Sequence, residues 1–195
     1  PPFFNPEADD AVNYAGIGAV IGHEIGHGFD DQGSQFDAQG EVNNWWSDQD
    51  REEFEKRTKA LISQYDQFSP EELDDEQKVN GALTVGENIG DLGGLTIAWK
   101  AWKKALAESG VSSPAEAEVI DGLSGPERFF TSWARIWRGK QRNDYAVQLL
   151  AIDPHSPAEF RCNGVLANFD EFADHYELSP GDALWISPED RVKIW

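Results

Sequence analysis

The stretch AGIGAVIGHEIGHGFDDQG, from Ala15 to Gly33, determines how the rest of the chain is interpreted. It contains the pattern H-E-x-x-H, formed by His23, Glu24 and His27. An α-helix rises about 1.5 Å per residue and places positions i and i+4 on one face. Both imidazoles can therefore hold one metal ion, and Glu24 supplies a carboxylate base for water beside it. The sequence predicts a helix with two zinc ligands and a general base.

The alternative is an ordinary amphipathic helix with histidines on its surface. Each glycine inside a helix costs about 0.5–1 kcal/mol relative to alanine. A helix that accepts several such losses is expected to lie close to another backbone or to a ligand. This expectation favours the metal-binding interpretation, and it rests on five glycines in or beside the helix: Gly16, Gly18, Gly22, Gly26 and Gly28.

Composition limits the class of protein. The 195 residues suit one domain or a large piece of a bigger protein. The net charge of −20 repels phosphate backbones and excludes nucleic acid as an expected partner. Cys162 is the only cysteine, so no internal disulfide can form, and we interpret it as a small buried residue on a helix. No apolar run reaches the 18 or so residues of a membrane span.

The chain begins Pro-Pro-Phe-Phe and contains no methionine, which is typical of an excised fragment. Targeting signals in the parent protein are therefore not visible, and the compartment is left open between cytoplasmic and extracellular.

The apolar periodicity predicts a mainly α fold with at most a small β element, near residues 35–42 or at the C-terminus. Three helix starts share the pattern of a serine cap, a proline and a glutamate three residues after the serine. No boundary divides the chain into separate domains. The expected helices run from near Asp9 through the histidine pair, from Ser47 to Tyr65, from Leu83 to Glu108, from Ser113, from Ser124, from Ser156 and briefly from Asn168.

A catalytic zinc site needs a third protein ligand. Glu87 in the segment GENIGDLGG is the best candidate, and Asp91 follows it at i+4 on the same helix face. Asp91 can accept the second N–H of a ligand histidine and fix its orientation. The alternative is that Thr84-x-x-Glu87 forms a capping box at a helix start. The neighbouring glycines, which permit close helix approach, favour the ligand.

Four segments together resemble the neprilysin family of zinc metallopeptidases (peptidase family M13), of the bacterial kind. They are HEIGHGFDDQG at 23–33, GENIGDLGG at 86–94, DPHSPAEFRCNGV at 153–165 and RVKIW at 191–195. The resemblance covers nearly all of residues 1–195 and keeps the family order. It implies a zincin-type helical catalytic domain, the C-terminal catalytic portion of a longer peptidase.

The resemblance also implies roles for matching positions. The ligands of a single Zn²⁺ would be His23, His27 and Glu87, and Asp91 would be the partner of His23. The catalytic groups would be Glu24 as general base and His155 as oxyanion stabiliser. Arg161 would contact the substrate backbone, and an apolar pocket would be lined by Phe3, Val20 and Trp137.

Without the resemblance, several of these residues have plainer interpretations. His155 is compatible with a histidine in a turn, Arg161 with a surface ion pair, and Trp137 with the core. Asp30 and Asp31 either support the histidine helix or are solvated.

The implied activity is hydrolysis of peptide bonds in oligopeptides, with a preference for a large apolar residue after the scissile bond. The alternative is a noncatalytic zinc-binding or peptide-binding module. Family members also carry an upstream substrate-binding strand and a large helical lobe, which this chain does not contain. We therefore expect oligopeptides and the missing N-terminal lobe of the parent chain as partners, and reduced activity of the fragment alone.

Overall fold

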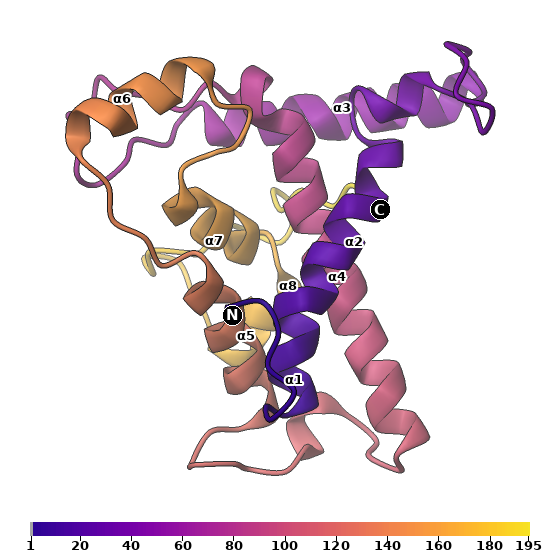
Figure 1. Ribbon diagram of the computed structural model, residues 1–195, viewed down its shortest axis with the longest axis vertical. Helices are drawn as coiled ribbons and strands as arrows, with labels where there is room; N and C mark the ends of the chain where they lie inside the picture. The colour runs from indigo at the N-terminus through magenta and orange to yellow at the C-terminus, as the bar shows by residue number, and fades with distance from the viewer. Residues whose placement is uncertain (1) are drawn as a thin grey trace.

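The computed structural model describes residues 2–195, which form helices joined by long loops (Figure 1). Within these residues, β structure is limited to two isolated bridges, Phe36–Val42 and Ile120–Leu123. The predicted mainly α fold is confirmed, with its small β element near residues 35–42. The helices are α1 (Asp10–Asn13), η1 (Tyr14–Gly18), α2 (Ala19–Gly26), η2 (His27–Phe29), η3 (Gly33–Gln35), α3 (Asp48–Tyr65), α4 (Gly81–Glu108), η4 (Pro114–Glu116), α5 (Gly125–Ile136), α6 (Asn143–Ile152), α7 (Ala158–Ala167) and α8 (Asp170–His175).

The helix that carries the histidine pair begins where the sequence predicts. The side chain of Asp9 caps it by accepting a hydrogen bond of 3.0 Å from the backbone N–H of Ala11. The chain then runs through a π-helical turn, η1, and on through α2 and the 3₁₀ turn η2. A Cβ atom on Gly16 in η1 would lie 2.3 Å from the carbonyl oxygen of Phe3. Glycine is therefore required where the N-terminal segment crosses this turn.

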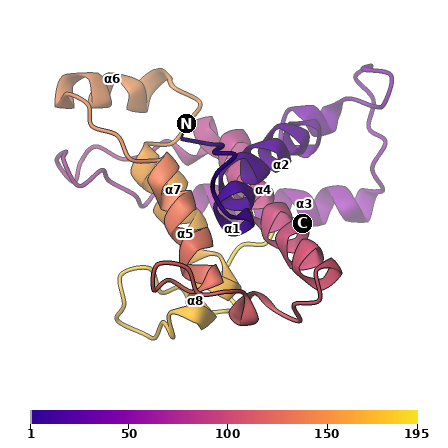
Figure 2. The same cartoon turned by 60° about the horizontal axis from the view of Figure 1, so that its bottom comes forward.

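Helices α2 and α4 lie side by side in both views, and glycines form their contact (Figures 1 and 2). A Cβ on Gly94 of α4 would lie 2.4 Å from the carbonyl oxygen of Ala19 and 2.7 Å from the backbone nitrogen of His23. A Cβ on Gly22 of α2 would lie 3.0 Å from the Cα of Gly94. The close backbone approach expected from the glycine-rich sequence is confirmed.

An aromatic core fixes the far half of α4. Trp99 and Trp102 of α4 stack on Phe130 and Phe129 of α5, with ring centroids 5.2 and 5.5 Å apart. Helix α1 packs on α5, and the Ser132 hydroxyl of α5 donates a hydrogen bond of 2.8 Å to the carbonyl of Val12. Through α5, these contacts hold α4 close to α1, the helix that precedes η1 and α2.

The last residues of the chain fasten α3 to the loop that follows α7. Arg57 of α3 donates to the carbonyl oxygen of Ile194 at 3.0 Å, and the Val192 N–H donates to Asn168 at 2.7 Å. The ring of Trp195 stacks on Phe54 of α3 with centroids 5.6 Å apart. The C-terminal segment thereby supports the end of α3 that lies near η2.

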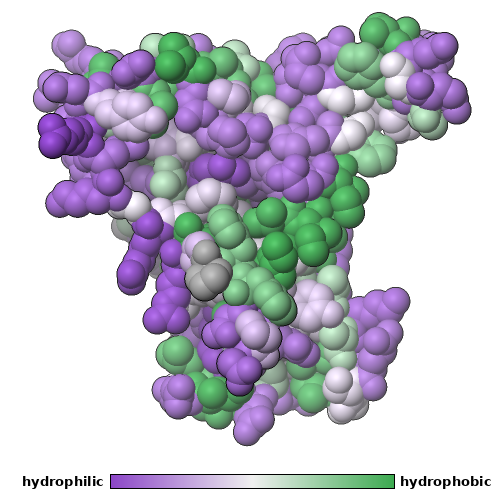
Figure 3. All heavy atoms as spheres, viewed as in Figure 1, coloured by the Kyte–Doolittle hydropathy of each residue, from purple (hydrophilic) through white to green (hydrophobic). Residues whose placement is uncertain are grey.

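Helix α2 also presents apolar residues on its outer face. Ile21, Ile25 and Phe29, at helical spacing, are 53%, 62% and 43% exposed. Figure 3 shows this hydrophobic surface over α2. A helix with apolar residues on opposite faces is typical of one enclosed by protein on both sides. Among residues 2–195, no helix is long and apolar enough to cross a membrane.

The predicted helix starts succeed where the cap is local. Ser47 caps α3, and Ser124 with Glu127 forms a capping box at α5. The start predicted at Ser113 is wrong as an α-helix, because η4 there is a single 3₁₀ turn. The cap predicted at Ser156 is also wrong, because its hydroxyl donates to the side chain of Asn88 at 2.7 Å.

Two further differences concern α4 and α6. Asn80 caps α4 through the N–H of Leu83, so Thr84 lies inside the helix and the alternative capping box is wrong. Helix α6 is not predicted from the sequence, and it begins at Asn143 with Arg142 in the cap position and no side-chain cap hydrogen bond.

The glycine contact generates a stability prediction. Replacing Gly94 by alanine should lower the free energy of unfolding by about 2 kcal/mol or more, because the methyl group would push α2 away from α4. The matched control is Gly26→Ala on α2, whose Cβ would meet only the Cα of Gly90 at 3.8 Å. That change should raise the unfolding free energy by about 0.5–1 kcal/mol through helix propensity. Urea unfolding followed by circular dichroism measures both. Equal stability of the two variants would contradict the role assigned to the contact.

Candidate metal centre

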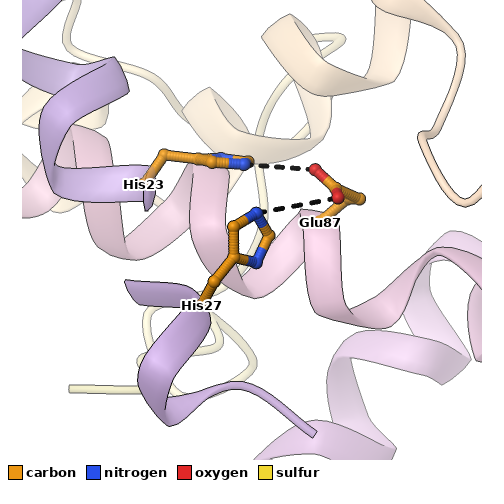
Figure 4. A group of neighbouring side chains, drawn as sticks. All are labelled: His23, His27 and Glu87. Atoms are coloured by element: carbon orange, nitrogen blue, oxygen red, sulfur yellow. Dashed lines mark ion pairs between the residues drawn. The ribbon is translucent and has the colours of Figure 1, made fainter. Parts of the chain in front are cut away.

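The predicted metal ligands converge at the contact of α2 with α4. His23 lies on α2, His27 at the start of η2, and Glu87 on α4 (Figure 4). Ligand atoms of the three side chains all lie within 4.8 Å of one another. The two imidazole rings are nearly perpendicular, with centroids 4.6 Å apart. Across residues 2–195, no other group of histidine, cysteine and carboxylate side chains has this geometry.

A carboxylate orients each of the two imidazole rings by contacting its Nδ1 atom. His23 Nδ1 lies 2.9 Å from Asp91 Oδ1, and His27 Nδ1 lies 2.8 Å from Asp30 Oδ2. Because a carboxylate accepts hydrogen bonds, each ring carries a proton on Nδ1 and points Nε2 at Glu87. The Nε2 atoms are 3.1 and 3.7 Å from the oxygens of Glu87. Lone pairs on nitrogen and oxygen therefore face one another unless a cation or a proton lies between them.

This arrangement fits a zinc ion. Glu87 Oε2 is buried and receives no hydrogen bond from any described residue. A buried carboxylate oxygen without a donor costs about 1–3 kcal/mol or more, so it indicates a missing positive partner. Two imidazole nitrogens and one carboxylate form a typical ligand set for catalytic zinc.

The electrostatics favour positive charge at the same point. Burial disfavours protonation of His23, but the hydrogen bond with Asp91 and the charges of Asp91 and Glu87 outweigh it and raise the pKa of His23 to about 9. Burial opposes ionisation of Glu87, yet the imidazoles of His23, His155 and His27 beside it hold its pKa below the usual range. The site is therefore arranged to surround one positive charge.

A third imidazole reaches Glu87 from the loop between α6 and α7. His155 Nε2 lies 3.1 Å from Glu87 Oε2, and its Nδ1 lies 2.8 Å from Asp153 Oδ1. Asp153 Oδ1 also accepts the backbone N–H of His155 at 2.9 Å, which fixes the turn. The side chain of His155 is 44% exposed, so one side of the ring remains open to a ligand.

Arg161 of α7 connects Asp91 with the surrounding cavity. Its Nε and Nη2 atoms donate to the two oxygens of Asp91 at 2.7 and 2.8 Å. Its Nη2 lies 3.8 Å from Glu87 Oε2, and its guanidinium carbon lies 4.2 Å above the ring of Trp137. Burial opposes the charge of Arg161, but the bond to Asp91 raises its pKa above the ordinary value.

A cavity of about 620 Å³ opens beside these residues. His155, Arg161 and Trp137 line it, together with α6 and the loop around Glu71. Phe3 and Val20 are not among the residues that line it. The roles of Phe3 and Val20 in an apolar pocket therefore stay predictions.

The remaining predicted residue, Glu24, is exposed on the turn of α2 that joins the two histidines.

Two residues of the centre were missed or left open by the sequence. Asp30, which the sequence left open between support of the histidine helix and solvent, contacts His27, and its i+3 spacing from that histidine is a signal that could have indicated the contact. Asp153 was missed, although its position two residues before His155 suits a side chain that closes a turn. Cys162 is buried as predicted, and burial raises its pKa to about 12, so it stays a thiol.

The fold and site define a class of protein. A helix that presents H-E-x-x-H to a glutamate on a second helix is the metal centre of a zinc-peptidase type. The chain belongs to Peptidase family M13, whose family model matches residues 1–192.

Individual relatives agree with this assignment. The chain is 41% identical over 195 residues to membrane metallo-endopeptidase-like 1 of Homo sapiens and 40% identical over 194 residues to neutral endopeptidase of Lactococcus lactis subsp. cremoris. The first alignment covers 100% of this chain and 24% of the relative, and the second covers 100% and 28%.

A solved structure is also similar. The zinc metalloprotease ZMP1 of Mycobacterium tuberculosis, in complex with an inhibitor, shares 55% identity and a TM-score of 0.93, covering 100% of this chain and 29% of that one. The chain thus spans about a quarter of the length of the relatives it matches. Membership of this family implies zinc as the metal.

The carboxylate of Asp30, which contacts His27, generates a prediction about metal affinity. Asp30→Asn keeps the acceptor of the Gln32 and Gly33 N–H groups but replaces the oxygen that faces His27. We expect Zn²⁺ affinity to fall roughly 10–100-fold, because the orientation and basicity of His27 are lost. Competition with a chromophoric chelator measures the affinity. The control is Asp31→Asn, whose carboxylate contacts Gln32 rather than a ligand. A similar loss in both variants would refute a specific role for Asp30.

Proposed function

We propose that the whole protein is a zinc-dependent endopeptidase that cleaves peptide bonds in oligopeptides. One zinc ion per chain is held by His23, His27 and Glu87. The observation that carries the proposal is the orphaned, buried oxygen of Glu87 facing two oriented imidazoles within 4.8 Å. When bound, Zn²⁺ polarises the scissile carbonyl and makes water a stronger nucleophile near neutral pH.

Glu24 is the general base in this proposal. Its carboxylate is exposed and lies on the same helical turn as both histidine ligands. It accepts a proton from the attacking water and passes that proton to the nitrogen of the leaving amine. General acid–base catalysis of this kind accounts for roughly 10²–10⁴-fold in rate.

His155 stabilises the negative charge that develops on the carbonyl oxygen. Asp153 holds the ring through Nδ1, so Nε2 is aimed at the metal centre. A ring protonated on both nitrogens donates one hydrogen bond to Asp153 and the other to the substrate oxygen. Because the ring is fixed before the reaction, little reorganisation is needed as the charge forms.

Arg161 and Trp137 form the substrate-binding part of the centre. Arg161 is held rigid by Asp91 and is available to a backbone carbonyl of the peptide after the scissile bond. Trp137 lies under its guanidinium and provides apolar surface in the cavity. These features support a preference for a large apolar residue after the bond that is cut.

The alternative from another class is a noncatalytic zinc-binding or peptide-binding module. A structural zinc site is usually closed by four protein ligands, often cysteines. Here three side chains form the group, and the only cysteine is buried on α7. The geometry therefore favours the catalytic proposal.

The rest of the parent chain is proposed as a partner of this one. The exposed apolar residues Ile21 and Ile25 lie on α2, the helix that carries Glu24, and Phe29 lies on the turn η2 that follows it. Since the relatives are about four times longer than this chain, further protein is available to cover that face and complete substrate binding. The isolated fragment is accordingly expected to be less active than the whole protein.

Replacing the proposed base tests the proposal directly. Glu24→Gln in the whole protein should reduce kcat for a neutral peptide by about 10²–10⁴-fold, since the amide cannot accept the proton of water. Zinc content, measured by atomic absorption, should stay at one per chain because Glu24 is not a ligand. Glu55→Gln on α3, where Glu55 pairs only with Lys59, is the control. Undiminished cleavage by Glu24→Gln would end the endopeptidase proposal.

The apolar preference is tested at Trp137. Trp137→Ala should reduce kcat/KM about tenfold or more for a peptide with phenylalanine after the scissile bond, because about 150–250 Å² of aromatic surface is lost. The corresponding alanine peptide should be affected less. Steady-state kinetics with the two peptides measures the ratio, and an unchanged ratio would contradict the role of Trp137 in selecting the substrate.

A further inference from the structure

A buried hydrogen bond joins α4 to the turn that carries His155. The Ser156 hydroxyl donates to Oδ1 of Asn88 at 2.7 Å, between residues 68 positions apart in the sequence. Both residues are buried, with exposed fractions of 3% and 1%. Glu87 comes directly before Asn88, and His155 directly before Ser156. Two pairs of consecutive residues therefore face each other, one in the metal centre and one in the interior beside it.

The Asn88 end of this hydrogen bond is held firmly by α4. Asn88 Nδ2 donates to Thr84 Oγ1 at 3.0 Å, and Thr84 Oγ1 donates to the carbonyl oxygen of Asn80 at 3.2 Å. The glycine and aromatic contacts of α4 fix the helix itself. Because Asn88 uses its amide nitrogen within its own helix, its amide oxygen can accept from a residue of another element.

The turn that contains Ser156 is otherwise held by local hydrogen bonds. The ring and the backbone N–H of His155 both contact Asp153, two residues earlier. Helix α7 begins after Pro157 without a side-chain cap hydrogen bond. His155 also contacts Glu87, but Glu87 is a candidate metal ligand and the proposed partner of His155 is the substrate. The bond from Ser156 uses none of these atoms, so it ties the turn to α4 whether or not the centre is occupied.

The chemistry of this bond suits positioning better than packing. Two apolar side chains of the same shape would fill the space with little change in stability, because a buried hydrogen bond adds only modestly to folding. A hydroxyl that donates to an amide oxygen at 2.7 Å, in contrast, fixes both a distance and a direction. Stabilisation of an oxyanion needs such precision, since a misplacement of about 1 Å can cost roughly 10²-fold in rate.

We propose that Asn88 and Ser156 are positioning residues for the reaction, whose hydrogen bond sets His155 relative to the metal ligand Glu87. This inference rests on the proposed peptidase function, and it deepens that function by naming how the oxyanion-stabilising ring is held. The polar groups of the two side chains satisfy each other, so they act through His155 rather than on the substrate.

Removing the hydroxyl tests the proposal in the full-length, zinc-loaded protein. Ser156→Ala should lower kcat for a neutral peptide about tenfold, less than the roughly 10²–10³-fold loss of a whole oxyanion donor, because the ring is displaced and not removed. KM and zinc content should stay at their wild-type values. The matched control is Thr84→Val, which leaves Asn88 Nδ2 without its acceptor but keeps the bond from Ser156. It should lower Tm by a similar amount and keep the wild-type kcat. An equal fall of kcat in both variants would refute positioning.

A double-mutant cycle shows whether Ser156 acts through His155. In the background of His155→Gln, adding Ser156→Ala should change kcat by less than about twofold, because the ring that the hydroxyl positions is already gone. A tenfold loss in both backgrounds would overturn the proposal.

A second variant keeps the proposal testable if Ser156→Ala folds poorly. Asn88→Leu with Ser156→Ala removes both polar partners, so its Tm should return toward the wild-type value. Its kcat should nevertheless stay about tenfold low, because the direction fixed by the hydrogen bond is still missing. Recovery of kcat together with Tm would assign the bond to stability alone and contradict the proposal.

Hydrogen–deuterium exchange separates this inference from the proposed function, because it needs neither zinc nor activity. In the zinc-free full-length protein, Ser156→Ala should speed exchange of the segment 155–161 about threefold or more and leave the segment 81–94 of α4 unchanged. Unchanged exchange of the segment 155–161 would overturn the tie between the turn and α4. If that exchange rises but the wild-type protein cleaves no neutral peptide with zinc, the peptidase proposal fails, and the role of the bond in positioning a catalytic group fails with it. If cleavage occurs and Ser156→Ala keeps the wild-type kcat, only the positioning role is overturned.

Discussion

The close contact of α2 with α4 is the constraint on which the rest of the structure depends. His23 can reach Glu87 only because no side chain separates the two backbones at Gly22, Gly90 and Gly94. A Cβ on Gly90 would lie 2.7 Å from Nδ1 of His23, the atom that meets Asp91. The same glycines therefore permit the packing and leave room for the ring. Their cost in helix stability is offset by the aromatic contacts between α4 and α5.

The metal centre is a set of buried charges that compensate one another only in part. Asp91 accepts hydrogen bonds from two donors, Arg161 on one side and His23 on the other. Glu87 is surrounded by the Nε2 atoms of three imidazoles, each of which is tied to another carboxylate through Nδ1. One buried oxygen remains without a donor. The folded chain is therefore stabilised by binding a cation at this oxygen, and because the oxygen is buried, water does not take the place of that cation.

The sequence predicted those parts of the fold that depend on local contacts. The caps at Ser47 and Ser124, and the shared face of Glu87 and Asp91, follow from spacings within one helix. The pattern at Ser156 looks the same, but its hydroxyl bonds to a residue 68 positions away, which no local rule can reveal. Helix α6 could not be predicted from the sequence pattern, because it begins without a side-chain cap and buries only Ala146. The fold class and the grouping of His23, His27 and Glu87 were therefore predictable, whereas the cavity walls depended on tertiary placement. The pairing of Asp153 with His155 is local, and its two-residue spacing could have indicated it.

This distinction explains why a chain that spans about a quarter of its relatives' length can bring the candidate metal ligands together. His23 lies on α2 and Glu87 on α4, and although α3 separates these helices in the sequence, their own glycines and aromatics pack them into place. All three candidate ligands therefore come from residues 2–195. The outer face of α2, in contrast, remains apolar and exposed. The candidate ligands are thus confined to one helix pair and the turn after α2, whereas the cavity walls come from loops and helices that lie far apart in the sequence.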